Sequence, residues 1–356
     1  MATITKRKRK DGTVSYTAQI RLTVDGQKYT ESKTSPDKRF LQRWAAKREA
    51  DLTKPGVMEQ EKHRGTTLGD VLEWYKEDFN GATKFGRSKL SHIDYLINHS
   101  LSLLDAVHLQ SSDLVKHAHR RAKTAKAATI NNDFIWLRNA MQAVQVSRGI
   151  PVNLKAIDEA TYILRKERVI AKSSLRDRRP TIQELEKILA YLVDRDTRSQ
   201  LPMVDIVLFA IFSTRRQGEI CSIRWEDLDE RRHGVLVREM KHPRDKKDTF
   251  VFLPDIAWSI IHAQEKLDDR IFPYVSKSVS AAFTKTCQFL EIVDLDFHDL
   301  RHEGISHLFE LEWDIPKVAA VSGHKSWGSL QRYVHLRESG YYDKYQGWDW
   351  IAKFTC

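Results

Sequence analysis

Polar and apolar residues alternate through most of the first 35 positions, and two Asp-Gly pairs interrupt the alternation. Both positions of a tight hairpin turn need φ > 0, which Asp-Gly supplies, so the pattern predicts three antiparallel strands. Ser35, Pro36 and Asp37 then give helix-start signals, with Ser35 as the predicted N-cap. An apolar stripe at helical spacing follows, made of Phe40, Leu41, Trp44, Ala45 and Leu52. Residues 1–60 are therefore predicted to form a three-stranded sheet with one helix on its face.

The apolar period becomes helical between residues 66 and 165. Two stripes recur at steps of three and four positions, Leu68, Val71, Leu72, Tyr75 and Phe79, then Ile130, Phe134, Leu137, Met141 and Val144. Gly149 and Pro151 follow the second stripe as helix stop signals. The stripes predict an all-helical segment with its own core. Its polar side is predicted to be basic and to carry His117, His119, Arg120, Arg121, Lys123 and Lys126.

Residues 166–180 have no apolar period and are rich in Lys and Arg, which predicts a basic interdomain linker. Thr181 and Glu184 have the spacing of a capping box and open a new helix. From there the pattern is helical, except for two β-like runs, GVLVREM and DTFVFLP, whose connection KHPRDKK predicts a hairpin with a cationic tip. The predicted fold is mostly α with small β elements. Its parts are a sheet-and-helix unit (1–60), a helical unit (66–165), the linker, and a mixed but mainly α unit with a C-terminal tail (181–356).

Composition adds a preference for polyanionic partners, because 59 Lys and Arg against 48 Asp and Glu leave a formal charge of +11. Nucleic acid is the first candidate, and a charge that only keeps the protein soluble is the alternative. Cys221, Cys287 and Cys356 are too few and too widely spaced for a disulfide framework or a zinc knuckle, which indicates a reducing compartment. No apolar run approaches the ~18 residues of a membrane span, and the N-terminus lacks the apolar core of a signal peptide. We therefore expect a cytoplasmic protein with no membrane partner.

The stretch LDFHDLRHEG (295–304) places His298, Arg301 and His302 on one face of a predicted helix. Such a cluster fits a metal site, a phosphate site or a solvated surface. The zincin pattern requires Glu directly after the first His, but here Asp299 is one carbon too short. Arg301 would also put a fixed cation beside the metal. A metal site is therefore disfavoured, and we predict none.

Three further stretches favour a phosphate site. They supply two arginines with a glutamate, a hairpin lysine, a histidine after a Ser-Gly turn and a tyrosine nine residues later, namely Arg215, Arg216, Glu219, Lys241, His324 and Tyr333. The arginines lie in a segment, 212–228, that is predicted to be helical. Arginines fork onto phosphate oxygens and neutralise transition-state charge, a lysine or histidine can protonate a leaving oxygen, and a tyrosine can be the covalent nucleophile. The set predicts metal-free phosphoryl transfer.

In this order and spacing the chain resembles the tyrosine recombinases, or phage integrase family. Their signature is an arginine in R-x-x-E, a β-hairpin lysine, an H-x-x-R segment, a histidine in G-H-x-S and a tyrosine about nine residues on. The matching residues are Arg216 with Glu219, Lys241, His298 with Arg301, His324 with Ser326, and Tyr333. The resemblance covers 181–336. More weakly, the helical unit is similar to a core-binding domain and the basic sheet to an arm-binding domain. The family usually has Thr-Gly where this chain has Ser213-Thr214, and the R-x-x-E spacing selects Arg216 over Arg215.

The resemblance implies site-specific DNA recombination, as an integrase of a mobile element. Tyr333 would attack a phosphodiester to give a 3′-phosphotyrosyl link, and Lys241 would protonate the leaving 5′-oxygen. The phosphate would be held by Arg216, Arg301, His298 and His324. No metal or other cofactor is implied. Expected partners are double-stranded DNA at core and arm-type sites, further copies of the chain in a tetramer on DNA, and accessory DNA-bending proteins. Binding to DNA would place the protein at the nucleoid.

Several residues outside the catalytic set also receive predicted roles. Residues predicted to contact DNA are Lys6, Arg7, Lys8, Arg9, Lys10, Arg120, Arg121, Arg178, Arg179 and Arg215. Glu219 and His302 are expected to support the catalytic set. Alternative nucleophiles that lie beyond the family spacing, and are expected to be packing residues, are Tyr341, Tyr342 and Tyr345.

Two questions remain open at the level of sequence. The aromatic tail, with Trp348, Trp350, Ile351 and Phe354, is expected to pack either on its own catalytic unit or on a neighbouring protomer. Three rival functions also remain: a DNA invertase of the same family that acts on inverted repeats, a type IB topoisomerase, and a DNA-binding regulator without catalytic activity.

Overall fold

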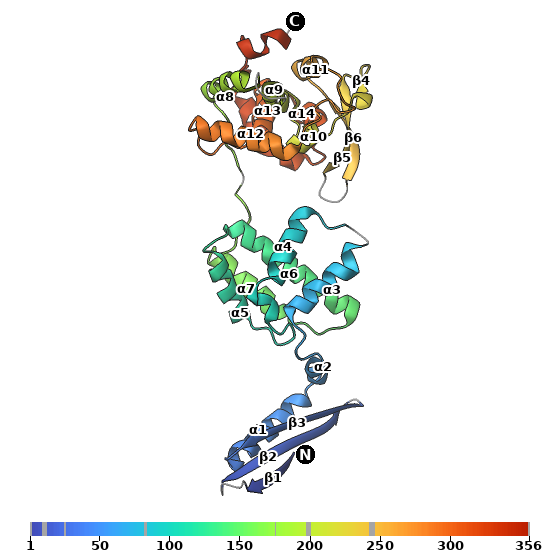
Figure 1. The fold of residues 1–356 in the computed structure, drawn as a ribbon, viewed down its shortest axis with the longest axis vertical. Helices are drawn as coiled ribbons and strands as arrows, with labels where there is room; N and C mark the ends of the chain where they lie inside the picture. The colour runs from blue at the N-terminus through green and yellow to red at the C-terminus, as the bar shows by residue number, and fades with distance from the viewer. Residues whose placement is uncertain are drawn as a thin grey trace. The chain divides into compact units, whose positions relative to one another are not determined.

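The computed structural model describes residues 2–8, 13–24, 26–81, 84–174, 176–196, 201–241 and 246–354 (Figure 1). Two compact units divide the chain, Met1–Ser174 and Leu175–Cys356. The predicted fold class is confirmed: helices predominate, and the described residues form two small antiparallel sheets of three strands each. None of the helices in these ranges is long and apolar enough to cross a bilayer.

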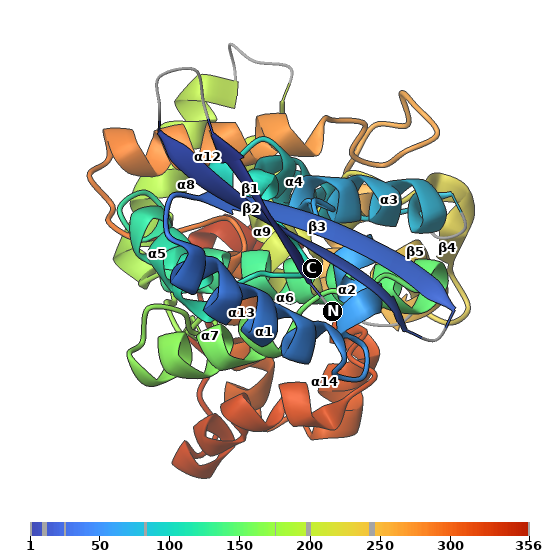
Figure 2. The ribbon, with the colours of Figure 1, turned by 90° about the horizontal axis from the view of Figure 1, so that it is seen from below.

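The first unit begins with the predicted sheet and helix. Its elements are β1 (Thr3–Lys8), β2 (Val14–Val24), β3 (Gln27–Ser35) and α1 (Lys38–Leu52). The strands pair antiparallel in the order β1-β2-β3, and α1 lies against the sheet (Figure 2). Ala18 and Ile20 of β2 are buried with Leu41, Ala45 and Leu52 of α1, so the alternating strand pattern and the helical stripe meet in one small core.

The start of α1 differs from the prediction. Asp37, and not Ser35, is the N-cap, because its carboxylate accepts hydrogen bonds from the backbone amides of Arg39 at 2.8 Å and Phe40 at 3.1 Å. The Ser35 hydroxyl instead accepts from the Asp37 amide at 3.1 Å. Phe40 also leaves the predicted stripe: it is 40% exposed, and the Lys33 ammonium lies 5.1 Å from its ring centroid.

The rest of the first unit is helical, as predicted. Its elements are α2 (Val57–Lys62), α3 (Leu68–Asn80), α4 (Arg87–Ile97), η1 (Ser100–Leu103), α5 (Ser111–Arg121), α6 (Ala127–Arg148) and α7 (Leu154–Lys166). Both predicted stripes enter one core, in which only Phe79 among their members stays partly exposed. Gly149 ends α6 with a left-handed φ of 66°, the geometry expected of a glycine C-cap.

One residue that was predicted on the basic surface of this unit lies in its core. His117 on α5 is 0% exposed, and its ring packs edge-on against His99 with 4.6 Å between the centroids. Neither ring nitrogen of His117 has a hydrogen-bond partner within the described residues. Burial, followed by His99 and the nearby arginines Arg120 and Arg121, lowers the pKa of His117 to about 4, so the ring is neutral at pH 7.

The second unit holds the remaining elements. They are α8 (Ile182–Asp196), α9 (Met203–Ser213), α10 (Gln217–Ile220), η2 (Trp225–Asp227), β4 (Leu228–Asp229), β5 (Gly234–Lys241), β6 (Lys246–Phe252), α11 (Asp255–His262), α12 (Ser276–Phe289), α13 (Asp299–Glu310), α14 (Ile315–Ser322), η3 (Trp327–Ser329), η4 (Gln331–Ser339) and η5 (Asp349–Phe354). The predicted capping box is present, since Thr181 and Glu184 each accept a hydrogen bond from the other's backbone amide. The predicted hairpin is β5–β6; its cationic tip, 242–245, lies outside the described residues.

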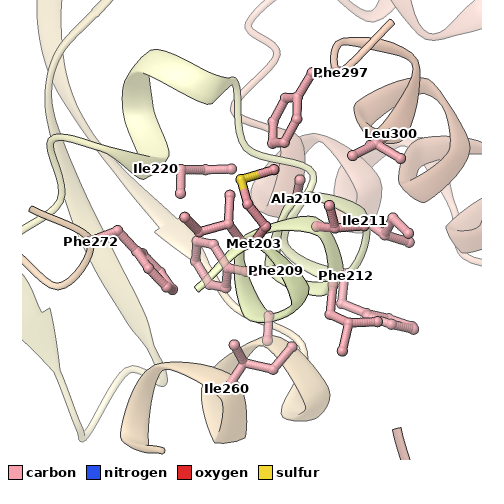
Figure 3. Close-up of a cluster of buried hydrophobic side chains, with 14 of the residues drawn as sticks. Met203, Phe209, Ala210, Ile211, Phe212, Ile220, Ile260, Phe272, Phe297 and Leu300 are labelled. Carbon is pink, nitrogen blue, oxygen red and sulfur yellow. The ribbon is translucent and has the colours of Figure 1, made fainter. Parts of the chain in front are cut away.

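The core of this unit is organised around α9. This helix is apolar on nearly all sides, which is typical of a helix buried all round. Figure 3 shows Phe209 near Phe272, which lies between α11 and α12, and places Phe297 and Leu300 beside the same cluster. The segment predicted to be helical over 212–228 is instead broken: α9 ends at Ser213 and only the single turn α10 follows.

The aromatic tail packs on its own unit. Tyr345, Trp348, Ile351 and Phe354 belong to the same buried cluster as α9. The Tyr345 hydroxyl donates to Glu303 of α13 at 2.9 Å, and the Lys344 ammonium lies 2.9 Å from the same carboxylate. Of the two arrangements left open by the sequence, the structure has the intramolecular one.

The linker arginines are also tied to this unit and do not project into solvent. Arg176 donates to Asp299 at 2.6 Å, and Arg178 pairs with Glu184. The guanidinium of Arg179 donates to Glu303 at 2.8 Å and to Glu310 at 2.6 Å. The prediction that Arg178 and Arg179 contact DNA is therefore not supported, because carboxylates of the same unit already occupy both side chains.

Candidate active site

A close contact between α9 and α13 builds the site. Gly304 of α13 faces α9 so tightly that a Cβ there would stand 1.9 Å from the carbonyl oxygen of Ile211. Any side chain would push the helices apart. Thr214, directly after α9, adopts a φ of 54°, which is rare for a β-branched residue and reverses the chain direction. Together the two features bring the Thr214 carbonyl to the guanidinium of Arg301.

Arg301 is held by backbone carbonyls. Its guanidinium donates to the Thr214 carbonyl and, at 3.0 Å, to the Ser322 carbonyl, and it lies 3.5 Å from the His324 ring. The side chain is 3% exposed. Burial, reinforced by the cations of Arg215 and Arg216, lowers the pKa of Arg301 well below its ordinary value. An anion bound here would relieve that destabilisation, which is the property that a phosphate site needs.

The two neighbouring arginines have different surroundings. Arg215 is 1% exposed and donates to the Ser213 carbonyl at 3.1 Å and to the Val321 carbonyl. Burial lowers its pKa to about 10. A contact between Arg215 and the DNA backbone, as predicted, is thus ruled out by its position in the core. Arg216 is half-buried, precedes α10 and donates to Glu219 at 2.7 Å.

Arg216 and Glu219 line an open cavity of about 540 Å³. Its other lining residues are Gly218, Ser222, Arg224, Arg238, Glu239 and Met240. Burial opposes the charge on Glu219, but Arg215, Arg216 and Arg301 outweigh burial, so the pKa of Glu219 is lowered and the carboxylate stays ionised. Glu219 therefore acts as the shared counter-ion of the three arginines, and it fixes Arg216 at the edge of the cavity.

Tyr333 lies on η4, which packs against α13. It is 7% exposed, and its hydroxyl is hydrogen-bonded to Nδ1 of His302. The two rings stack with 6.2 Å between centroids, and the Arg332 guanidinium lies 5.2 Å from the tyrosine ring. Burial raises the pKa of Tyr333, although Arg332 and Arg301 oppose the rise. The phenol is protonated at neutral pH and has a defined acceptor.

The other two histidines flank Arg301 and His302. His298 caps α13, and its ring meets the His302 ring edge-on at 5.0 Å. Nδ1 of His324 is 2.7 Å from the Ser322 hydroxyl. Burial, followed by Arg301, lowers the pKa of His324 to about 3, and the same two causes lower that of His298. Both rings are therefore neutral at pH 7 and are available as hydrogen-bond donors to an anion.

Comparison with known proteins agrees with this geometry. Residues 179–339 match the model of the phage integrase family. The shufflon-specific DNA recombinase of Escherichia coli is 38% identical over 180 residues, which cover 49% of this chain and 44% of that protein. The chain thus spans less than half the length of this relative. The integrase of Salmonella phage P22 is 26% identical over 158 residues, covering 38% of this chain and 40% of that integrase.

Solved structures extend the likeness of the fold. A lambda integrase dimer bound to a COC′ core site covers 95% of this chain and 96% of its own, with a TM-score of 0.62 and 16% identity. The Tn1549 transposon integrase in complex with transposon right end DNA covers 75% of this chain and 94% of its own, with a TM-score of 0.55 and 14% identity. Residues 179–339 of this chain form a phage integrase family domain. The fold of the chain is that of the lambda integrase across both units.

The structure brings five of the six predicted catalytic residues together in the second unit, as the contacts above describe: Arg216, His298, Arg301, His324 and Tyr333. The sixth, Lys241, ends β5, and its side chain lies outside what the structure describes. Among the predicted DNA contacts, Lys6, Arg7 and Lys8 are exposed on β1 and Arg120 is exposed on α5, whereas Arg9 and Lys10 lie outside the described residues. Arg121 is engaged inside its unit, with Asp133 at 3.2 Å and the Tyr95 ring at 3.7 Å.

Some supporting residues could not be predicted. Asp299 and Glu303 are held by Arg176 and Arg179, which lie 123 and 124 positions earlier. Ser322 contacts His324, and Arg332 donates to the Arg176 carbonyl. The sequence does mark Asp299 and Glu303, since Asp299 lies inside the H-x-x-R-H stretch and Glu303 follows it directly. Searched over the described ranges, the structure has no group of three or more His, Cys, Asp and Glu side chains placed to hold a metal.

Proposed function

We propose that this protein is a site-specific DNA recombinase that cleaves and rejoins DNA strands through a 3′-phosphotyrosine intermediate. The observation that carries the proposal is the closeness of Arg301, a buried cation held by two backbone carbonyls, to a protonated phenol, Tyr333, which contacts the next residue of the same helix, His302. A buried cation whose hydrogen bonds go to neutral groups favours a phosphodiester, and the phenol supplies a nucleophile.

The roles follow from the surroundings of each side chain. Arg216 and Arg301 would fork onto the nonbridging oxygens and neutralise the charge of the transition state. His298 and His324, both neutral, would donate hydrogen bonds to the same phosphate. Lys241 would protonate the leaving 5′-oxygen as Tyr333 forms its bond to phosphorus. Because the bond to Tyr333 keeps the energy of the broken phosphodiester, rejoining would need no cofactor.

A suicide DNA substrate tests the function. A nick close to the cleavage site lets the short strand diffuse away, so the covalent enzyme–DNA adduct accumulates and is seen on a denaturing gel. A recombinase should give an adduct at one defined site, a type IB topoisomerase should relax supercoiled DNA with little site preference, and a regulator should give neither. Adduct formation should persist in EDTA, and its loss there would revive the metal site.

The biological outcome is proposed as integration or excision of a mobile element. Inversion of DNA between inverted repeats is the second candidate, because the relative with 38% identity is described as a shufflon-specific recombinase. Plasmids that carry the recombination sites in direct or inverted orientation separate these outcomes: excision gives a deleted circle, and inversion changes the restriction pattern at constant length. The proposed substrate places the action at chromosomal or phage DNA, in the nucleoid.

The first unit is proposed to bind DNA in two ways, through a core-binding helical part (66–165) and an arm-binding sheet (1–60). The exposed lysines and arginine of β1 support the second role. A tetramer on DNA is proposed from the lambda integrase tetramer on a Holliday junction, and accessory DNA-bending proteins are part of the same proposal. Deletion of residues 1–60 should leave cleavage of a short core site intact and abolish recombination that needs arm sites.

A further inference from the structure

The hydroxyl of Tyr333 has a specific partner. Within the described part of the chain, its hydrogen bond to Nδ1 of His302 is the one that it makes. His302 follows Arg301 directly on α13, whereas Tyr333 is 31 positions further along the chain, on η4. The His302 and Tyr333 rings also stack, with an angle of 30° between their planes, so the hydrogen bond is supported by ring packing. The proton of the nucleophile is therefore already directed at a base before any DNA is bound.

We propose that His302 is the general base of strand cleavage, accepting the Tyr333 proton as the phenol oxygen attacks phosphorus, and the acid that returns this proton on rejoining. The inference rests on the proposed function and adds a catalytic residue to it. The O–P bond to Tyr333 forms and the P–O5′ bond breaks. One proton goes from Tyr333 to Nδ1 of His302, and another goes from Lys241 to the 5′-oxygen, so charge and atoms balance. Rejoining runs the same transfers backwards.

The surroundings of His302 keep it neutral and ready to accept. Burial comes first in lowering its pKa to about 4, and the rings and cations of His298, Arg332 and Arg301 act in the same direction. The carboxylate of Asp299 on the same helix opposes them, and Tyr333 is the remaining titratable group that faces the ring. At neutral pH the imidazole thus carries its proton on Nε2 and leaves the Nδ1 lone pair free for the phenol.

The difference in basicity decides how the proton moves. Burial raises the pKa of Tyr333 above its ordinary value while that of His302 is lowered to about 4, so a complete transfer to His302 before attack would be strongly uphill. Transfer is far easier when it accompanies formation of the O–P bond, because the phenol becomes acidic as its oxygen is esterified. His302 is therefore expected to act during bond formation and not to produce a free phenolate.

Other groups near the nucleophile are committed elsewhere. His324 is bonded to the Ser322 hydroxyl on the Arg301 side of the helix. Asp299 receives two hydrogen bonds from Arg176 and one from the amide of Asp296. The Arg332 guanidinium donates to the Arg176 carbonyl. Among the described side chains, His302 is the group that both contacts the phenol and can take up a proton.

The rigidity of α13 supports this role. On the turn that carries His302, Glu303 is fully buried and held by Arg179, Lys344 and Tyr345. One turn earlier, Asp299 is held by Arg176. These contacts prevent the helix from rotating, so the direction of the His302 ring is set by its packing and not by the hydrogen bond alone.

The test is single-turnover cleavage of the suicide substrate by His302→Asn, whose amide oxygen can accept a hydrogen bond near the Nδ1 position but cannot take the proton. The expected result is a cleavage rate roughly 100- to 10,000-fold lower, the usual range for a general base, with DNA affinity and melting temperature near those of the native protein. His262→Asn, a histidine exposed on α11, is the matched control and should cleave normally. His302→Gln provides a second variant in case the first one folds poorly.

Cleavage rates on a substrate with a modified leaving group, and with a modified tyrosine at position 333, distinguish a general base from a residue with a purely structural role. A substrate with sulfur as the bridging 5′ atom needs no acid for its leaving group, so it should rescue Lys241→Ala and leave His302→Asn slow. A fluorinated tyrosine at position 333, which has a more acidic phenol, should speed His302→Asn more than it speeds the native protein. Rescue of His302→Asn by the sulfur substrate, or a native cleavage rate in both His302 variants, would overturn the assignment. Absence of any adduct from the native protein would instead overturn the proposed function itself.

Discussion

The molecule contains two edge-on histidine pairs with similar geometry and different surroundings. In the first unit the rings of His99 and His117 are 4.6 Å apart, and in the second those of His298 and His302 are 5.0 Å apart. The pKa of His117 and that of His302 are both lowered to about 4, with burial as the first cause and neighbouring cations adding to it. Both are neutral imidazoles at pH 7.

What distinguishes the pairs is the partner of the buried ring. The two nitrogens of His117 meet no hydrogen-bonding group in the described structure. The ring therefore only fills space in the core, and burying its polar nitrogens costs free energy. His302 directs its lone pair at the Tyr333 hydroxyl. A lowered pKa by itself thus does not identify a functional histidine; contact with a proton that must move does.

The comparison depends most strongly on the tyrosine. Tyr333→Phe removes the proton and the nucleophilic oxygen together, and covalent adduct formation should fall to zero while binding to the DNA site stays near normal. Denaturing gels measure the adduct, and gel-shift titration measures binding. If the variant still forms an adduct, the nucleophile is another tyrosine, and the exposed Tyr341 and Tyr342 would be the ones to replace next.

The next largest effect is expected from replacing Arg301, the arginine between His298 and His302 on α13. Arg301→Lys should slow cleavage roughly 100- to 1000-fold, by analogy with removal of one transition-state hydrogen-bond donor. A lysine cannot bridge the Thr214 and Ser322 carbonyls and still fork onto a phosphate. Single-turnover rates on the suicide substrate provide the measurement, with Arg301→Ala for comparison. A lysine variant within tenfold of the native rate would contradict the role.

His117, the histidine without a hydrogen-bond partner, should make the free energy of unfolding sensitive to acid. The folded pKa of His117 is about 4 and the unfolded value is 6.5, so below pH 6.5 the unfolded chain binds the extra proton and folding is weakened. Between pH 7 and 5 the loss is about 2 kcal/mol from this residue. His117→Leu should remove that part of the pH dependence, as urea unfolding at the two pH values would show. An unchanged pH dependence would mean that the ring is solvated.

A smaller effect is expected from the other buried tyrosine, which sharpens the contrast with Tyr333. The Tyr345 hydroxyl donates to the carboxylate of Glu303 and not to a neutral imidazole, so it has a structural role. Tyr345→Phe should destabilise the second unit by about 1.5–3 kcal/mol, the value of one hydrogen bond to a charged acceptor. The cleavage rate per folded molecule should not change. Thermal unfolding together with the adduct assay tests both statements.

Sequence periodicity predicts the elements of this protein well, because each stripe reports which face of a helix or strand is buried. Periodicity could not place individual polar residues. Arg215 looked like a surface arginine, and its acceptor, the Val321 carbonyl, is 106 positions away. The carboxylate partners of Arg179 are 124 and 131 positions away, so a locally basic segment resembled a free linker.

The candidate site shows the same division. The spacing of His298, Arg301 and His324 follows from short motifs, and local chemistry was enough to propose their role. The contact between His302 and Tyr333 needs α13 and η4 to be packed together, which no local pattern encodes. His117 was misplaced for a related reason, since a histidine on an amphipathic helix fits either face.

The partners of Glu303 also determine when the second unit can be completed during synthesis. Lys344 and Tyr345 lie 41 and 42 positions after Glu303. At translation rates of ~5–20 residues per second, the helix that carries Arg301 and His302 is made about 2 to 8 s before those partners. Until then the Glu303 carboxylate has Arg179 as a partner but lacks Lys344 and Tyr345. A growing chain that has reached Tyr333 but not Tyr345 would therefore carry the nucleophile on an incompletely packed unit.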